Sequence, residues 1–265
     1  MMSPEMNIAV RAIRKAGRII TSASDNLQNI KIHTKAYNSY VTNVDLEVEK
    51  FLVKSLEEAF PDHFFITEES GSFGNSKSKC AWIIDPIDGT NNFIRGLPHH
   101  CISLAMQFKN EILLSLIYNP YLDQLFTAHK GSGAKLNNSR IRVGGRKKIQ
   151  GSLLSGSLKY SYDVFKKNYP DAILNLHKLG ISGLRYSGSL SLDMCYVAAG
   201  YLDGIWTSRD AKIWDTAAAS LIIKEAGGML SSINGGVEYL SKGRLIAGNP
   251  NIVRKLISFF KPYLV

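Results

Sequence analysis

WIIDPIDGTNNF, residues 82–93, begins as an apolar run and ends in two acids, a glycine and a hydroxyl. The apolar run 81–84 predicts a short buried strand. Asp85 precedes Pro86, and a residue before proline is restricted to extended backbone. The carboxylate of Asp85 is therefore expected at the end of the strand, where the chain leaves the core.

The second half of the same stretch predicts a tight return of the chain. Asp88 can turn back toward the side of Asp85, and Gly89 permits close backbone approach. We expect Thr90 to be the N-cap of a short helix that runs through Phe93. Two carboxylates would then lie beside a helix N-terminus, whose free N–H groups suit a phosphate. Mg²⁺ would relieve the repulsion among these negative charges.

A simpler explanation of Asp-Pro-Ile-Asp-Gly is an ordinary turn, with proline early and glycine late. Two further stretches argue for a site instead. One is FFITEES at residues 64–70, and the other is WDTAAA at 214–219, which runs on to EAGG at 225–228.

Together the three stretches resemble the signatures of the inositol monophosphatase family of Mg²⁺-dependent phosphatases. The family pattern is GEES, then WIIDPIDGTxNF, then WDxAA followed by EAGG. Thr67 stands where the family has glycine, and the other two matches are close. The resemblance spans nearly the whole chain. It implies a layered α-β-α-β-α sandwich, a homodimer, inhibition by Li⁺ and hydrolysis of a small phosphorylated alcohol such as inositol 1-phosphate.

The resemblance also implies a set of ligands for two or three Mg²⁺ ions. Glu68, Asp85 and the carbonyl of Ile87 would bind one ion, and Asp85, Asp88 and Asp215 a second. A third, weaker ion would touch Glu68. All of these are hard oxygen donors, and two ions that share a carboxylate form a clamp for phosphoryl displacement. Taken alone, Asp215 before an alanine run would rather suggest a helix N-cap.

Catalytic and substrate-binding roles follow from the same resemblance. Thr90 and Glu68 would position the attacking water, and Asp45 would belong to the hydrogen-bond network behind them. The backbone N–H groups of Gly89 and Thr90 would hold the phosphate. The full substrate-binding set is Asp88, Gly89, Thr90, Gly188, Ser189, Leu190 and Asp215.

The residues that would select the alcohol depart from the family. In inositol-selective relatives, a glutamate seven residues before the motif aspartate reads ring hydroxyls; here that position is Ser208. Asp210 could replace the missing acid, or it could pair at the surface with Arg209 or Lys212. The family segment Gly-Thr-Ala appears as Gly-Ser-Leu at 188–190. We therefore expect broad specificity, because only a buried carboxylate that reads a hydroxyl discriminates strongly.

The remaining pattern predicts an α/β protein with two unlike halves in one compact unit, residues 1–145 and 146–265. Helices on an antiparallel sheet are expected in the first half, and alternating strands and helices in the second. The expected helices are 5–24, 42–60, 164–179, 189–199, 216–226 and 250–260. The expected strands are 64–67, 103–108, 111–118, 124–129, 152–155, 184–187 and 204–207, with two more near Met229 and Leu245. The segment 70–79 is expected to be a polar loop.

Composition is that of an ordinary globular protein, with 265 residues, 45% of them hydrophobic and 20% charged. No apolar run reaches the roughly 20 residues that a membrane helix needs. Cys80, Cys101 and Cys195 are far apart and odd in number, which excludes a disulfide framework and favours a reducing cytosol.

The net charge of +10 could serve nucleic acid. No RNA-binding module or recognition helix is evident, so we favour attraction of anionic phosphate esters. The alternatives are a phosphatase for 3′-phosphonucleotides or sugar phosphates, and a protein that binds RNA or the transcription machinery with residual catalysis.

Overall fold

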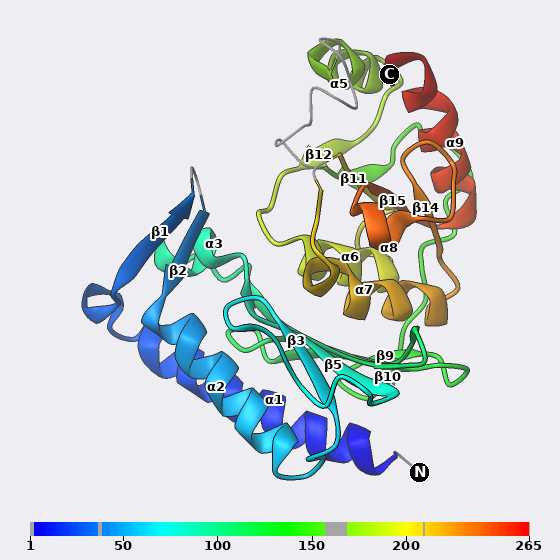
Figure 1. Ribbon diagram of the computed structural model, residues 1–265. Helices are drawn as coiled ribbons and strands as arrows, with labels where there is room; N and C mark the ends of the chain where they lie inside the picture. Colours follow the sequence, from blue (N-terminus) through cyan, green and yellow to red (C-terminus); the bar gives the residue numbers. More distant parts are fainter. Residues whose placement is uncertain (1–2, 37–38, 157–168, 209, 265) are drawn as a thin grey trace.

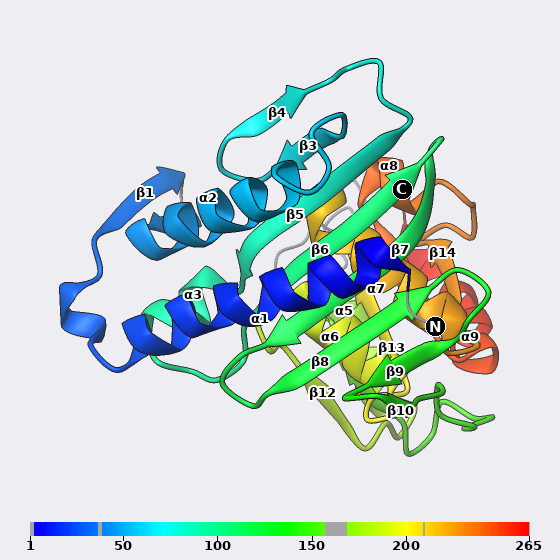
Figure 2. The ribbon, with the colours of Figure 1, turned by 90° about the horizontal axis from the view of Figure 1, so that it is seen from below.

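The computed structural model describes residues 3–36, 39–156, 169–208 and 210–264, and they form five alternating layers (Figure 1). Helices α1 (Pro4–Ser24) and α2 (Asn43–Glu57) cover one face of an eight-stranded sheet (Figure 2). Helices α6 (Leu190–Ala198) and α7 (Ile213–Glu225) lie between this sheet and a five-stranded sheet. Helices α5 (Tyr169–Lys178) and α9 (Pro250–Phe260) cover the outer face of the second sheet. The predicted layered α/β fold is confirmed.

The eight-stranded sheet is antiparallel except for one pair, which positions the first acids. Its strand order is β10-β9-β8-β7-β6-β5-β3-β4. The strands are β3 (Phe64–Thr67), β4 (Gly71–Gly74), β5 (Cys80–Asp88), β6 (Cys101–Phe108), β7 (Glu111–Asn119), β8 (Gln124–His129), β9 (Ala134–Leu136) and β10 (Ser139–Arg140). Only β3 and β5 run parallel, with Thr67 paired to Ile84. Glu68 and Asp85 therefore follow paired positions and lie side by side at the carboxyl end of this parallel pair.

The five-stranded sheet contains both parallel and antiparallel strand pairs, and its parallel strands end at one edge of the sheet. Its order is β12-β11-β13-β15-β14. The strands are β11 (Leu153–Ser155), β12 (Gly183–Arg185), β13 (Gly204–Thr207), β14 (Met229–Ser232) and β15 (Leu245–Gly248). Strand β11 is parallel to both β12 and β13, so the carboxyl ends of the three meet at one edge. In open α/β sheets that edge is where ligands bind.

Strong local signals gave correct elements. Strands β3, β8 and β13 and helix α9 match their predicted bounds. The hairpin between β6 and β7 turns at Lys109 and Asn110, both with positive φ, as a tight primed turn requires. None of the helices within the described residues is long and apolar enough to cross a membrane. We propose that the two sheets mark the predicted halves 1–145 and 146–265.

Several predicted bounds were wrong, and two hairpins were missed, one of them formed by β9 and β10. Strands β1 (Ile32–Ala36) and β2 (Ser39–Thr42) pair in a region that carried no strand prediction, because β1 is exposed along its whole length and its residues do not alternate. The polar segment 70–79 contains β4 and is not a loop throughout. The residues 157–168, which include the start of the helix predicted at 164–179, lie outside the described residues. Shorter elements are η1 (Leu27–Asn29), α3 (Thr90–Ile94), α8 (Tyr239–Lys242) and η2 (Lys261–Tyr263).

Candidate active site

A cleft of about 310 Å³ lies between the edges of the two sheets and contains most of the predicted site residues. Lined by residues of both halves, it includes Glu68, Asp85, Ile87, Asp88, Gly89, Thr90, Gly188, Ser189, Leu190 and Asp215. A volume of this order suits a small ligand. Ser208 and Asp210 do not line it.

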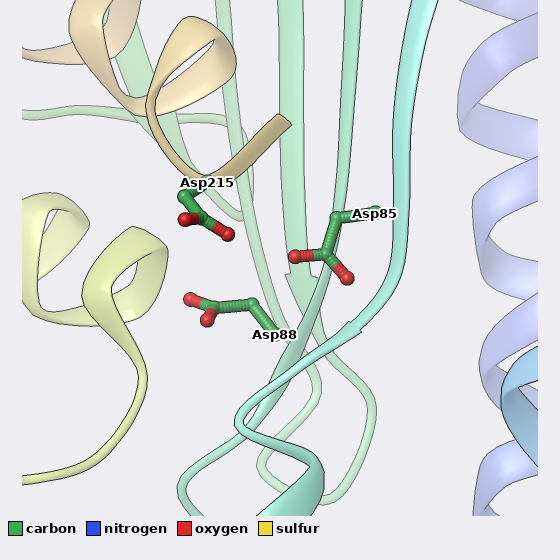
Figure 3. Close-up of side chains that lie close together, drawn as sticks. All are labelled: Asp85, Asp88 and Asp215. Atoms are coloured by element: carbon green, nitrogen blue, oxygen red, sulfur yellow. The ribbon is translucent and has the colours of Figure 1, made fainter. Parts of the chain in front are cut away.

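Three acids converge in the cleft from two different elements. Asp85 and Asp88 come from β5, and Asp215 comes from the first turn of α7 (Figure 3). One oxygen of each carboxylate lies within 4.8 Å of the others. Asp85 and Asp88 are buried, and Asp215 is half-buried. Buried carboxylates at this separation repel one another, and a divalent cation with oxygen ligands would offset that repulsion.

Strand β5 brings its two acids together in a way that the sequence did not predict. The strand continues through Pro86 to Asp88, four residues beyond the predicted run. Its pairing with β6 is interrupted between Asp85 and Asp88, where the register shifts. Because Pro86 has no N–H to give to a ladder, the interruption falls where proline is tolerated. The shift directs both carboxylates to the cleft.

Helix α3 begins one residue earlier than predicted, which changes the role of Thr90. Gly89 is the N-cap, with φ of 97°, and Thr90 is the first helical residue. A Cβ at Gly89 would lie 3.1 Å from the carbonyl oxygen of His99, so a side chain there would be both strained and crowded. The Thr90 hydroxyl, free of a capping role, lies 3.2 Å from Asp45 Oδ1 and 3.0 Å from the carbonyl oxygen of Ile87.

Asp45 is held rigidly behind this hydroxyl. It closes a capping box at the start of α2, where it accepts the backbone N–H of Thr42 at 2.8 Å and also the Thr42 hydroxyl. Burial raises the pKa of Asp45 to about 6, and the hydrogen bonds from Thr42 oppose that rise. When the Thr90 hydroxyl donates its hydrogen bond to Asp45, the Thr90 oxygen can accept a hydrogen bond from a water molecule in the cleft.

Glu68 lies beside the acid cluster and contacts a lysine that the sequence analysis did not single out. Lys35 Nζ, on β1, donates to Glu68 Oε1 at 3.0 Å and to Glu69 Oε1 at 2.5 Å. Glu49 of α2 accepts the backbone N–H groups of Glu69 and Ser70, both at 2.9 Å, and so shapes the turn that carries Glu68. A cation is thus already part of the arrangement around these carboxylates.

The second half of the chain orients Asp88. Ser189 is the N-cap of α6, and its hydroxyl donates to Asp88 Oδ2 at 2.7 Å. The backbone N–H of Ser191 donates to the same oxygen, also at 2.7 Å. Ser189 was predicted to bind substrate, and in this structure it fixes the direction of an acid. Leu190, next to it, also lines the cleft.

Asn92 and His99 connect the halves around the cleft and were not predicted to do so. Asn92 Nδ2 donates to the carbonyl oxygens of His99 and Ser187, at 2.6 Å and 2.7 Å. His99 Nε2 lies 2.9 Å from Asp193 Oδ1 on α6. Pairing between residues so distant in the sequence gives no local signal.

Asp215 is not an N-cap. Helix α7 starts at Ile213, three residues earlier than predicted, and Asp215 accepts the backbone N–H of Lys212 at 2.9 Å from inside the first turn. The candidate hydroxyl readers also differ from expectation. Asp210 is exposed and pairs with Arg244 at 2.6 Å, and Ser208 is fully buried.

From the charges of the acid cluster we predict how the stability of the metal-free protein depends on pH. Burial raises the pKa of Asp85 well above its ordinary range, and the charges of Glu68, Asp88 and Asp215 raise it further. The folded chain then binds more protons than the unfolded chain between the ordinary pKa of an aspartate, about 4, and the raised value. The ionisation of Asp85 therefore lowers the free energy of unfolding as the pH rises through that window.

We expect Asp85→Asn to raise the melting temperature in EDTA at pH 8 by a few degrees, since about 1 kcal/mol shifts a chain of this size by about 2–4 °C. The gain should shrink at pH 5. The measurement is thermal unfolding of both proteins at the two pH values. If metal-free Asp85→Asn melted at a lower temperature than the unmodified chain at pH 8, the proposed repulsion among these carboxylates would be contradicted.

The fold and the acid cluster define a layered α/β protein with a cleft suited to divalent cations and phosphate. The sequence pattern of the Inositol monophosphatase family matches residues 1–261. The chain therefore belongs to the inositol monophosphatase family, a family of phosphatases.

Individual relatives agree with this assignment. The chain is 38% identical over 263 residues to "Nus factor SuhB" of Pasteurella multocida, covering 99% of this chain and 98% of the relative. Among solved structures, the extragenic suppressor protein SuhB from Bartonella henselae superposes with a TM-score of 0.93 at 36% identity, over 98% of this chain and 99% of that one. The inositol monophosphatase from Anabaena gives a TM-score of 0.83 at 30% identity, over 97% and 95%.

Proposed function

We propose that the protein hydrolyses small phosphate monoesters with the help of Mg²⁺, and that inositol 1-phosphate is a substrate alongside other compact esters. The observation that carries this proposal is the convergence of Asp85, Asp88 and Asp215, with oxygens within 4.8 Å of one another. Carboxylate oxygens are the ligands that Mg²⁺ prefers. Family membership supports the same class of reaction.

Each residue has a role in this proposal. Asp85, Asp88 and Asp215, together with Glu68 and the carbonyl of Ile87, would hold two to three Mg²⁺ ions. When bound, Mg²⁺ supplies positive charge for the phosphate and lowers the pKa of a water molecule. The ligand set would be completed by Glu68 turning from Lys35 toward Asp85.

The chain itself orients the reactants. Thr90, hydrogen-bonded to Asp45, would accept a hydrogen bond from the attacking water and so direct a lone pair of that water toward phosphorus, and Glu68 would accept the one proton that the water releases. The backbone N–H groups of Gly89 and Thr90 would bind the phosphate oxygens. Ser189 would keep Asp88 pointed into the cleft. The homodimer and the inhibition by Li⁺ rest on the family resemblance, and the cytosolic location rests on the number and spacing of the cysteines. All three stay predictions.

A panel of esters tests this proposal. We expect Mg²⁺-dependent phosphate release from inositol 1-phosphate, glycerol 2-phosphate and adenosine 2′-monophosphate, with kcat/KM values that differ by less than about a hundredfold, because Ser208 stands where inositol-selective relatives have the glutamate that reads the polyol ring. A preference for inositol 1-phosphate above that limit would contradict the broad specificity. No release from any ester would contradict the proposed function itself.

A second candidate is an interaction with the transcription machinery. The curated relatives are named Nus factors, and exposed basic side chains follow one another after β9, at Arg140, Arg142, Lys147 and Lys148. Binding by such charges alone should fall steeply with salt. Tight RNA binding that persists at about 200 mM salt would favour this candidate over simple attraction of anionic esters.

A further inference from the structure

The side-chain amide of Asn92 joins the two halves of the chain beside the cleft. Asn92 lies on α3, shortly after the turn at Gly89, and is only 9% exposed. Its Nδ2 donates to the carbonyl oxygen of His99 at 2.6 Å and to that of Ser187 at 2.7 Å. Because both neighbours are acceptors, the amide nitrogen must face them, and it uses both of its hydrogens. One side chain therefore ties α3 to a turn of its own half and to a segment of the other half.

The segment from the second half lies directly on this amide. Ser187 leads into Gly188, which has φ of 96°, and a Cβ there would lie 2.9 Å from Asn92 Nδ2. A residue with a side chain would be both strained and crowded at this position, so glycine lets the chain come this close. The next residue, Ser189, is the N-cap of α6. The contact with Asn92 thus fixes where α6 begins relative to α3.

The start of α6 carries two groups that hold Asp88. The Ser189 hydroxyl and the backbone N–H of Ser191 both donate to Asp88 Oδ2 at 2.7 Å. Together with the bond from Asn92 to Ser187, three hydrogen bonds join residues 88–92 of the first half to residues 187–191 of the second. Hydrogen bonds weaken steeply as their angles depart from the preferred range. A shift of this segment would therefore loosen the hold on Asp88.

We propose that Asn92 is a positioning residue for metal binding, because its amide holds residues 187–189 where the Ser189 hydroxyl can direct the Asp88 carboxylate into the acid cluster. The inference rests on the Mg²⁺ site of the proposed function. Hydrogen-bond partners behind a metal ligand set the direction of that ligand, and their loss typically weakens metal binding by about 10–100-fold. Asn92 acts one step further back, through Ser189.

Mg²⁺ binding, measured by calorimetry without any ester, tests this role in a double-mutant cycle. We expect Ser189→Ala to weaken Mg²⁺ binding by about tenfold, since it removes a donor to Asp88, and Asn92→Ala by about fivefold, since it releases that donor. Independent effects would multiply to about fiftyfold in the double variant. We expect a loss of only about ten- to twentyfold, because both changes act on the same hydrogen bond.

Asn119→Ala is the matched control. Asn119 is also fully buried, and its Nδ2 donates at 3.0 Å to the carbonyl oxygen of Pro98, in the turn that contains His99. Its Oδ1 accepts the backbone N–H groups of Tyr121 and Leu122. These contacts all lie in the first half. We expect Asn119→Ala to lower the melting temperature but to leave Mg²⁺ affinity within about twofold of the unmodified chain.

The outcomes separate a positioning role from a purely structural one. Asn92→Ala with a lower melting temperature and unchanged Mg²⁺ affinity would overturn the proposal, and so would a double variant that shows the full product of the single effects. Asn92→Ser, a smaller change measured in the same cycle, decides the question if Asn92→Ala does not fold.

The same measurements distinguish this proposal from the proposed function. An unmodified chain that binds no Mg²⁺ would overturn both. Mg²⁺ binding with the expected coupling, but without phosphate release from any ester, would overturn the phosphatase and support the role of Asn92.

Discussion

Asp88→Asn is expected to lower kcat/KM by about a thousandfold or more, since it removes one negative charge and one anionic oxygen from the centre of the acid cluster. The Asp88 carboxylate lies among the oxygens of Asp85 and Asp215 and is oriented by Ser189 and the N–H of Ser191. Asparagine has nearly the same shape, so the backbone should be preserved. The measurement is phosphate release from inositol 1-phosphate in saturating Mg²⁺.

The matched control is Asp210→Asn. Asp210 is an acid of the other half of the chain, where it is exposed and pairs with Arg244 outside the cleft. We expect its kcat/KM to stay within about twofold of the unmodified chain, as exposed ion pairs contribute little. An Asp88→Asn protein that keeps near-full activity with Mg²⁺ would show that the acid cluster does not hold the catalytic ions.

Trp206→Ala is expected to be the most destabilising single change in the second half, by about 3–5 kcal/mol. The indole is fully buried, packs 5.1 Å from the ring of Phe260, and donates to the Tyr169 hydroxyl. Removing it leaves a large cavity between β13 and α9. The melting temperature should fall by about 10 °C.

Trp206→Phe separates packing from hydrogen bonding at this position. Phenylalanine restores most of the ring but not the Nε1–H group, so we expect a loss of about 1–2 kcal/mol. If Trp206→Ala changed the free energy of unfolding by less than that, the hydrophobic cluster that α5 and α9 form on the outer face of the five-stranded sheet would not depend on this ring.

Local signals explain what the sequence could predict. The alternation and turn residues around β3, β8 and the β6–β7 hairpin are dictated by neighbours in the chain, and so are the bounds of α9, which begins with Asn249 as N-cap and a proline. The three motifs identified the elements that carry the acids. The order of layers followed from the family resemblance and from the change of pattern near residue 145.

The parts that the sequence could not predict depend on long-range contacts. Strand β1 is exposed along its whole length, and the hairpin is placed by contacts distant in the sequence: Lys35 of β1 reaches Glu68, and Ser39 and Tyr40 of β2 line the cleft. The position that binds the substrate hydroxyls in inositol-selective relatives was identified by its spacing, seven residues before Asp215, which is Ser208 in this chain. In the structure Ser208 is fully buried and lies outside the residues that line the cleft, which residue spacing alone could not show.

The orientation of Asp88 was equally hidden. It depends on Ser189 and Ser191, more than one hundred residues later in the chain. The predicted substrate contact at Ser189 and the observed contact with Asp88 involve the same hydroxyl. The packing of α6 between the two sheets decides which surface the Ser189 side chain faces. The periodicity of residues within α6 does not indicate this direction.

Phosphate release from inositol 1-phosphate, followed while Mg²⁺ is raised from zero in a chelated sample, tests the central claim most directly. We expect no turnover in EDTA, a saturable rise with Mg²⁺, and the loss of that rise in Asp88→Asn. Turnover in EDTA equal to that in Mg²⁺, or no turnover at any Mg²⁺ concentration, would contradict it.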